Sequence, residues 1–191
     1  MFIEIDNFLD KKSCEEIIRR CSAHIDKNKL DIEYNRQGNS VDTNQHEELK
    51  DLDQKIFKRL NLFITKRLSY SFSLNNVDLQ DTGYTFHRYE KGDKLYCHAD
   101  GLFSFESGQS IHPRVLSLSI NLTTNENADL IFPRHNKAIK SKEGKLVAFL
   151  PHPCYEHYMN NNSDSNRDVL VTWLVDQTIE CKQVKDGQEN I

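Results

Sequence analysis

The chain has 191 residues, of which 37% are hydrophobic and 28% charged, and its formal net charge is −4. This length suits one domain, and the composition is ordinary for a globular protein. The mild negative charge argues against the strongly positive field that draws a protein to nucleic acid or anionic lipid. The N-terminal segment lacks the apolar run of a signal peptide, and no window reaches the about 18 apolar residues of a membrane span. We therefore expect no membrane association.

The cysteines point to a cellular location. There are five of them, an odd number, and they form no Cys-x-x-Cys pair. Such a set favours reduced thiols rather than disulfides or a zinc site. We therefore expect a cytoplasmic protein.

The first part of the chain has helical signals. Residues 13–25 and 47–69 place apolar side chains at helical spacing, and Asp10 or Ser13 could cap the first helix. The segment between these helices, residues 31–45, is polar, and we expect a surface loop there.

The pattern changes to short strands after residue 80. Residues 84–89, 130–132, 145–150 and 169–175 are rich in β-branched and aromatic side chains. Residues 115–122 alternate leucine or isoleucine with serine or asparagine, which predicts a half-buried strand. Short strands at regular spacing indicate an antiparallel sandwich or jelly roll.

These elements predict an α+β fold, a double-stranded β-helix (jelly roll) with N-terminal helices packed on one sheet. Residues 1–80 would form the helical part of this single domain. Residues 81–176 would form the jelly-roll core, and residues 177–191 a polar C-terminal tail.

The triplet His98-Ala99-Asp100 is a candidate metal site, because residues i and i+2 of an extended chain point the same way. Two imidazoles and one carboxylate on one face of an iron(II) ion leave three positions open for other ligands. The chain has a second such triplet, His24-Ile25-Asp26, at the end of the first predicted helix. There, side chains at i and i+2 diverge by about 200°, so we reject it as a chelating pair.

His157 and Arg167 supply the remaining parts of a site. His157 follows a predicted strand, and Arg167 lies ten residues beyond it. Arg167 shares strand parity with Val169, Val171 and Trp173, which we take as the inward face. A guanidinium inside an apolar barrel is costly unless it meets an anion, and a carboxylate is a bidentate partner for it.

Residues 82–175 resemble the prolyl 4-hydroxylase-like branch of the iron(II) and 2-oxoglutarate-dependent dioxygenases. The resemblance rests on spaced motifs that run through the whole stretch, and the opening of the chain, residues 5–14, is also similar. The motifs are Tyr89-Glu90-Lys91-Gly92, His98-Ala99-Asp100, Arg114, Asn127-Ala128-Asp129-Leu130-Ile131-Phe132, Lys142-Glu143-Gly144 leading to Phe149, and His157, Arg167 and Trp173.

The resemblance implies that His98, Asp100 and His157 hold Fe(2+), and that Tyr89 and Arg167 hold 2-oxoglutarate. It implies that O2 and 2-oxoglutarate are consumed to give succinate and a hydroxylated substrate, with a peptide or protein side chain, proline first, as that substrate. Its recognition is expected in loops 31–46 and 101–113.

The sequence departs from the family pattern in two places. Asn127-Ala128-Asp129 replaces a Gly-Gly-Glu segment, and Leu95 stands where an aromatic residue is common. The first change concerns a strand edge, and the second puts in doubt how 2-oxoglutarate is held. His152 is a rival to His157 as the distal ligand, although it would place Arg167 fifteen residues away.

Two other functions stay open from the sequence. One is a non-catalytic jelly roll that binds a metal without turnover, and the other is an oxygenase acting on a small molecule or nucleic acid. We interpret His87 as a surface or structural histidine, Arg36 as a surface charge and Arg114 as a rim salt bridge. His46 lies in a polar loop and has no partner in the motif.

Overall fold

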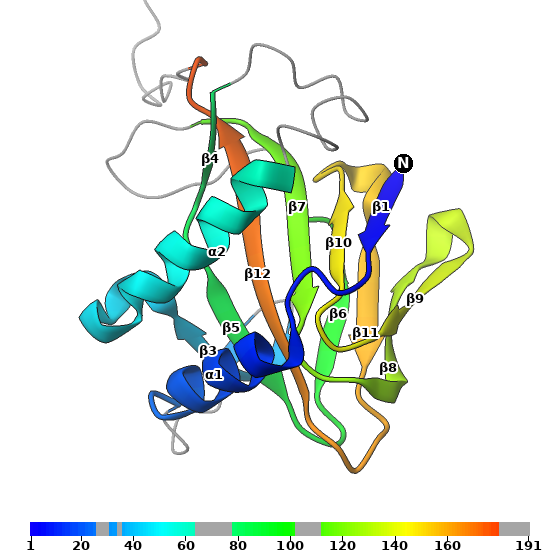
Figure 1. Cartoon of the computed structure of the whole chain (residues 1–191). Helices are drawn as coiled ribbons and strands as arrows, with labels where there is room; N and C mark the ends of the chain where they lie inside the picture. The colour runs from blue at the N-terminus through cyan, green and yellow to red at the C-terminus, as the bar shows by residue number, and fades with distance from the viewer. Residues whose placement is uncertain (26–30, 34–35, 64–77, 102–111, 180–191) are drawn as a thin grey trace, which may run out of the picture.

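The computed structural model describes residues 1–25, 31–33, 36–63, 78–101 and 112–179 (Figure 1). The described helices are α1 (Lys11–Ser22) and α2 (Lys50–Phe63), with short 3-10 helices η1 (Thr43–Gln45), η2 (Glu47–Leu49), η4 (Pro133–His135) and η5 (Pro153–Tyr155). The strands are β1 (Phe2–Ile5), β2 (Asp31–Glu33), β3 (Arg36–Asp42), β4 (Leu79–Asp81), β5 (Thr85–Tyr89), β6 (Lys94–His98), β7 (Arg114–Asn121), β8 (Asn125–Phe132), β9 (Lys137–Ser141), β10 (Leu146–Phe149), β11 (His157–Asn160) and β12 (Arg167–Asp176).

The strands form one antiparallel sheet that curls on itself. The order is β1-β10-β7-β12-β5-β3-β6-β11-β8-β9, with β2 on β3 and β4 on β12. The larger layer contains β1, β10, β7, β12, β5 and β3, in this order across the sheet. The smaller layer contains β6, β11, β8 and β9. This arrangement confirms the expected jelly roll.

Helices α1 and α2 cover the outer face of the larger layer, as expected (Figure 1). The N-cap of α1 is Asp10, whose carboxylate accepts a hydrogen bond from the Ser13 amide at 2.8 Å. The apolar faces of both helices are buried against the sheet. The buried helix residues are Cys14, Ile17, Cys21, Leu52, Ile56 and Leu60, and their strand partners include Phe86, Leu116, Leu118, Ile120, Leu170 and Leu174.

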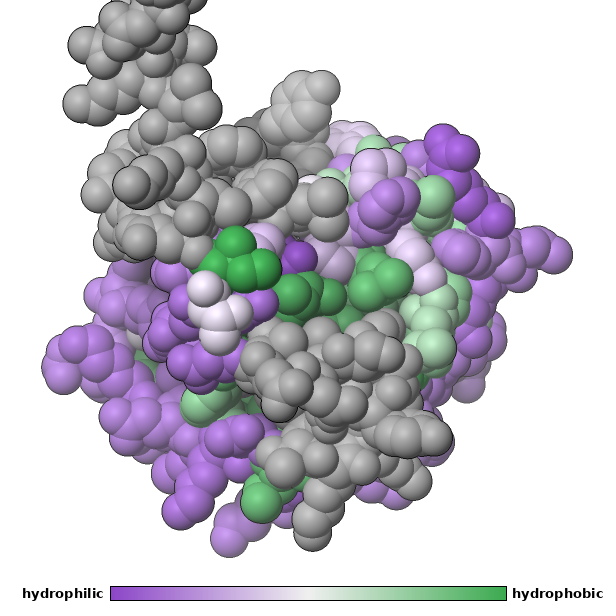
Figure 2. All heavy atoms as spheres, turned by 90° about the horizontal axis from the view of Figure 1, so that it is seen from above, coloured by the Kyte–Doolittle hydropathy of each residue, from purple (hydrophilic) through white to green (hydrophobic). Residues whose placement is uncertain are grey.

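A second apolar cluster lies between the two layers and includes Phe132, Phe149, Met159 and Val169. It surrounds the region in which the candidate site residues meet. Seen from above, hydrophobic residues gather near the middle of the face, with hydrophilic residues to the left and right of them (Figure 2).

The expected surface loop at residues 31–45 is wrong. This segment holds β2 and β3, and β3 pairs with β5 and β6, so it joins the two layers. The sequence of β3, Arg-Gln-Gly-Asn-Ser-Val-Asp, has no apolar alternation, and its buried Arg36 contacts the polar side chains of His87 and Ser40. The N-terminal part is therefore not only helical, since β1 to β4 also belong to it.

The strand over residues 115–122 is present as β7, but its polar face is not exposed to solvent. Ser117, Ser119 and Asn121 are buried, as are the alternating leucines and isoleucine. The leucine face packs toward the helices, and the serine and asparagine face points into the space between the layers.

The predicted second helix divides into η2 and α2, and residues 64–69 of that prediction lie outside the described part. Most of the expected loop 101–113 and of the tail 177–191 also lies outside it. In the described ranges, no helix combines the length and apolar character needed to span a membrane.

Candidate metal centre

Three predicted ligands meet at the junction of β6 and β11. His98 ends β6, His157 begins β11, and the two are directly paired in register. Asp100 lies two residues beyond the end of β6. Its Oδ1 is 3.4 Å from Nε2 of His98 and 3.8 Å from Nε2 of His157. The possible ligand atoms of all three residues lie within 4.8 Å of one another.

Each imidazole is oriented by a contact with the backbone carbonyl group two residues before it. Nδ1 of His98 lies 2.7 Å from the carbonyl oxygen of Tyr96, and Nδ1 of His157 lies 3.0 Å from that of Tyr155. A carbonyl accepts only from a protonated Nδ1, so each ring turns an unprotonated Nε2 toward Asp100 when neutral. This is the tautomer in which a histidine binds a metal through Nε2.

The charges of the three residues are coupled. Burial alone would raise the pKa of Asp100, but contact with His98 and the nearby His157 outweighs it and holds this pKa well below the ordinary value. Burial lowers the pKa of His157 more than Asp100 raises it. The site therefore presents a carboxylate at neutral pH, as a cation site requires.

Arg114 fixes the backbone next to this carboxylate. Its Nη1 donates to the Asp100 carbonyl oxygen at 2.6 Å, and its guanidinium stacks on Trp173 at 3.9 Å from the ring centre. These contacts tie Arg114 to the site, and the expected rim salt bridge stays a prediction. Arg114 connects the end of β6 to β7 and β12.

The three ligands open into a pocket of about 130 Å³ between the two layers. Apolar side chains and a few convergent polar groups line it together, as is usual for sites that take small molecules. The predicted inward face of β12 is confirmed, because Arg167, Val169, Val171 and Trp173 all line this pocket.

Arg167 and Tyr89 are also paired in register, on β12 and β5. Arg167 is 2% exposed, and its Nη2 donates to Oδ1 of Asn121 at 3.1 Å. Its Nε is buried and has no hydrogen-bond partner among the described residues. Burial lowers the pKa of Arg167, more than Tyr89 and nearby carboxylates raise it. A buried guanidinium with so little compensation is a site for an anion.

Sequence reasoning missed two pocket residues, Arg36 and His87. Both are buried, and Nη1 of Arg36 contacts Nδ1 of His87 at 2.6 Å. Burial, with Arg36 and Arg167 close by, holds the pKa of His87 well below its ordinary value, so the ring is a neutral acceptor. The polar sequence of β3 hid this role, since it gave no strand signal.

The rival ligand His152 and the unusual position Leu95 can now be placed. His152 is exposed, and its Nδ1 accepts from the Cys154 amide at 3.1 Å as the cap of η5, so it is outside the cluster. Leu95 lines the pocket, whereas Tyr96 is 45% exposed. Cys97 is exposed and is not part of the ligand cluster to which its neighbour His98 belongs.

The donor set fits a divalent iron ion. Two imidazole nitrogens and one carboxylate oxygen on one side of an ion are typical of non-haem iron(II) oxygenases, and they leave positions open for a bidentate organic acid and oxygen. The same pocket carries the buried Arg167, which fits a second carboxylate. These residues therefore match an iron ion together with a small dicarboxylate.

No protein family model matches the chain, and no curated protein matches it. Solved structures share its fold. A viral collagen prolyl hydroxylase from Paramecium bursaria Chlorella virus-1, solved with 2-oxoglutarate, is similar at a TM-score of 0.69 and 20% identity over 92% of this chain and 96% of that one.

Two further structures are similar. A Trichoplax adhaerens prolyl hydroxylase, solved with a peptide of hypoxia inducible factor, matches at a TM-score of 0.64 and 17% identity, covering 93% of this chain and 84% of that one. A Pseudomonas putida prolyl-4-hydroxylase matches at 0.60 and 15%, covering 92% of each chain. These likenesses show that the chain shares the jelly-roll fold of the three prolyl hydroxylases.

Proposed function

We propose that this protein is an iron(II) and 2-oxoglutarate-dependent dioxygenase that hydroxylates a peptide or protein side chain. One observation carries the proposal: the His98, Asp100 and His157 cluster and the buried Arg167 line the same pocket. Each feature alone occurs in proteins of many kinds, but together they provide a place for a metal and for the far carboxylate of a dicarboxylate. The shared fold with three prolyl hydroxylases supports it.

Each residue has a defined part in this reaction. His98, Asp100 and His157 would hold the iron, which supplies activation of oxygen when bound. Arg167, whose guanidinium lies 5.8 Å from the centre of the Tyr89 ring, would bind the distal carboxylate of 2-oxoglutarate. The apolar walls from Leu95, Phe149 and Val169 keep water from the reacting groups. The balanced reaction takes 2-oxoglutarate, O2 and a C–H bond to succinate, CO2 and an alcohol.

The structural neighbours support a peptide or protein substrate, with proline as the first candidate. All three are prolyl hydroxylases, and one of them was solved with a peptide fragment. Mass spectrometry of proline-containing peptides after turnover should find a gain of one oxygen atom. The cytoplasm stays the proposed location, and localising a tagged full-length chain would check it.

The test is formation of succinate from 2-oxoglutarate by the purified chain with iron(II), a reductant and air. Wild type should form succinate. Asp100→Ala should lower the rate by more than about 100-fold, because even changes outside the ligand shell cost about 10- to 100-fold. Asp164→Ala is the matched control, since this carboxylate is 89% exposed and pairs with Lys91 on the surface.

The non-catalytic alternative makes a different prediction. A jelly roll that only binds metal would retain iron in wild type and form no succinate. Failure of wild type both to bind 2-oxoglutarate and to form succinate would overturn the proposed function.

A further inference from the structure

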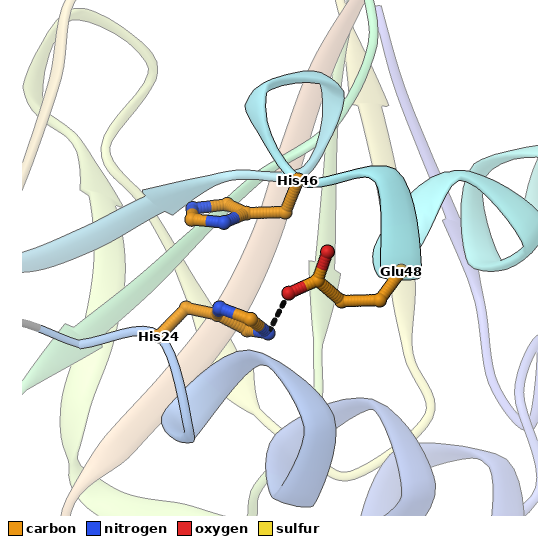
Figure 3. Close-up of side chains that lie close together, drawn as sticks. All are labelled: His24, His46 and Glu48. Atoms are coloured by element: carbon orange, nitrogen blue, oxygen red, sulfur yellow. Dashed lines mark ion pairs between the residues drawn. The ribbon is translucent and has the colours of Figure 1, made fainter.

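Another cluster of metal-ligating side chains lies on the helix-covered side of the larger layer. His24 follows the end of α1, His46 lies between η1 and η2, and Glu48 belongs to η2 (Figure 3). Their possible ligand atoms lie within 4.8 Å of one another. His24 and Asp26 were expected to diverge because both would lie in the first helix. In the structure α1 ends at Ser22, so His24 lies beyond the helix, and Asp26 lies outside the described residues. The partners of His24 in space are His46 and Glu48.

The spacing of His24 and Glu48 is already close to that of two ligands of one ion, and the His46 ring lies against the His24 ring. Nε2 of His24 is 3.4 Å from Oε1 of Glu48, and the two imidazole rings are tilted by 39° with centres 4.3 Å apart. Bonds of about 2.0 to 2.1 Å in a tetrahedron put neighbouring ligand atoms about 3.3 Å apart. Figure 3 shows the two rings on separate segments with the Glu48 carboxylate reaching toward His24.

The backbone under these side chains is anchored. The His24 amide donates to the Cys21 carbonyl at 3.0 Å, and Cys21 is fully buried. The His46 amide donates to the Thr43 carbonyl, and the Leu49 amide donates to the His46 carbonyl at 2.9 Å. Thr43 and Leu49 are each 1% exposed. Both sides of the cluster are thus held in place before any ion binds.

The nearby arginine does not compete with a cation for Glu48. Arg20 pairs with Asp51 through both oxygens of that carboxylate. It also donates to the backbone carbonyl of Glu48 rather than to its side chain. Arg20 therefore fastens η2 to α1, while the Glu48 carboxylate faces His24.

The geometry points to a second metal site, formed by His24, His46 and Glu48, that takes a zinc-class divalent ion. Two imidazoles and a carboxylate are a zinc donor set, and the partial exposure of His24 and Glu48 (20% and 61%) leaves room for water as a fourth ligand. The site is separate from the pocket. Strand β3 begins at the pocket with Arg36, and the opposite end of this strand, roughly 20 Å away, leads to His46.

A bound ion would tie the end of α1 to η2 across the intervening chain and would stabilise the folded state. It would not take part in oxygen chemistry. This inference stands whether or not the pocket binds iron.

Zinc binding to the full chain, measured by calorimetry and by metal analysis after dialysis, tests the inference. The background Asp100→Ala/His157→Ala removes the pocket cluster and should keep one zinc equivalent. Adding His46→Ala, or separately Glu48→Gln, should weaken this binding at least about tenfold, since changes outside the ligand shell already cost that much. Zinc should also raise the melting temperature of the background and not that of the His46→Ala variant.

His135→Ala is the matched control, because this histidine is exposed and stacks on Tyr155 outside both clusters. It should leave zinc binding unchanged. Circular dichroism of metal-free His46→Ala should match the background, and Glu48→Gln gives the answer if His46→Ala does not fold. Zinc binding that is absent from the background, or unaffected by both substitutions, would overturn the inference. Loss of 2-oxoglutarate turnover would not, since that concerns the pocket alone.

Discussion

Arg167 is the residue on which binding of a dicarboxylate depends most. It is buried, and the acceptor described for it is the neutral amide of Asn121. Arg167→Met should weaken 2-oxoglutarate binding at least about 30-fold. Truncating one partner of a buried charge pair costs ~2 to 5 kcal/mol, and the lower end of that range corresponds to this factor. Calorimetry with manganese(II) and no oxygen measures this.

Arg134→Met is the control for this change, because Arg134 is 61% exposed and pairs with Glu156 on the surface. Its 2-oxoglutarate affinity should equal that of wild type. Equal affinity in Arg167→Met would mean that the dicarboxylate binds elsewhere.

His157 and His152 give opposite predictions for the distal ligand. His157 is 6% exposed and lies beside Asp100, whereas His152 caps η5 outside the cluster. His157→Ala should lower manganese affinity in the presence of 2-oxoglutarate by at least about 100-fold, and His152→Ala should leave it unchanged. The assignment fails if only His152→Ala loses the metal.

At the scale of elements, α2 carries a half-buried carboxylate, Asp53, whose ionisation costs stability. Burial raises the pKa of Asp53 to about 6, helped by Asp81 and Asp42 and opposed by Thr43. This folded-state pKa lies above the ordinary value of 3.8, so the unfolded chain releases the proton more easily than the folded chain. The free energy of unfolding is therefore highest below pH 4 and falls as the pH rises through about 6.

Asp53→Asn should therefore raise the free energy of unfolding at pH 7 by about 1 to 3 kcal/mol, and change it little at pH 4. Urea denaturation at both pH values measures this. Asp51→Asn, on the same helix, should have the opposite sign at pH 7, because Arg20 holds the pKa of Asp51 below its ordinary value. A pH-independent effect of Asp53→Asn would contradict a stability cost that arises from its ionisation.

The elements also show why sequence reasoning worked where it did. β7 and β12 carry long β-branched or leucine-rich patterns, so their existence and the inward face of β12 could be predicted. The strand β3 could not, because Arg36, Gly38 and Ser40 carry no hydrophobic period. The burial of Arg36 and Gly38 depends on β5 and β6, which are distant in sequence.

The candidate ligands could be identified from sequence motifs, but their proximity in space could not be predicted. His98 and His157 are brought together by the β6–β11 register, and Tyr89 and Arg167 by the β5–β12 register. Registers of this kind are set by tertiary packing of the whole sheet. For the same reason the sequence offered no partner for His24 or His46.

At the scale of the whole molecule, one curled sheet serves two purposes. Its outer face packs on α1 and α2 through a large apolar cluster, and its inner face encloses the metal-ligating residues and Arg167. The two faces meet in β7. Its Leu116 and Ile120 belong to the apolar cluster under the helices, whereas its Ser119 lines the pocket and its Asn121 accepts a hydrogen bond from Arg167. Stability and chemistry are thus carried by alternate residues of the same strands.

The central claim, coupled oxidation of 2-oxoglutarate and a substrate, is tested most directly by labelling dioxygen with the heavy isotope of oxygen. Mass spectrometry of the succinate formed by wild type should find one labelled atom from the gas, and the Asp100→Ala variant should form labelled succinate more than about 100-fold more slowly. Unlabelled succinate, or consumption of oxygen without succinate, would contradict the account.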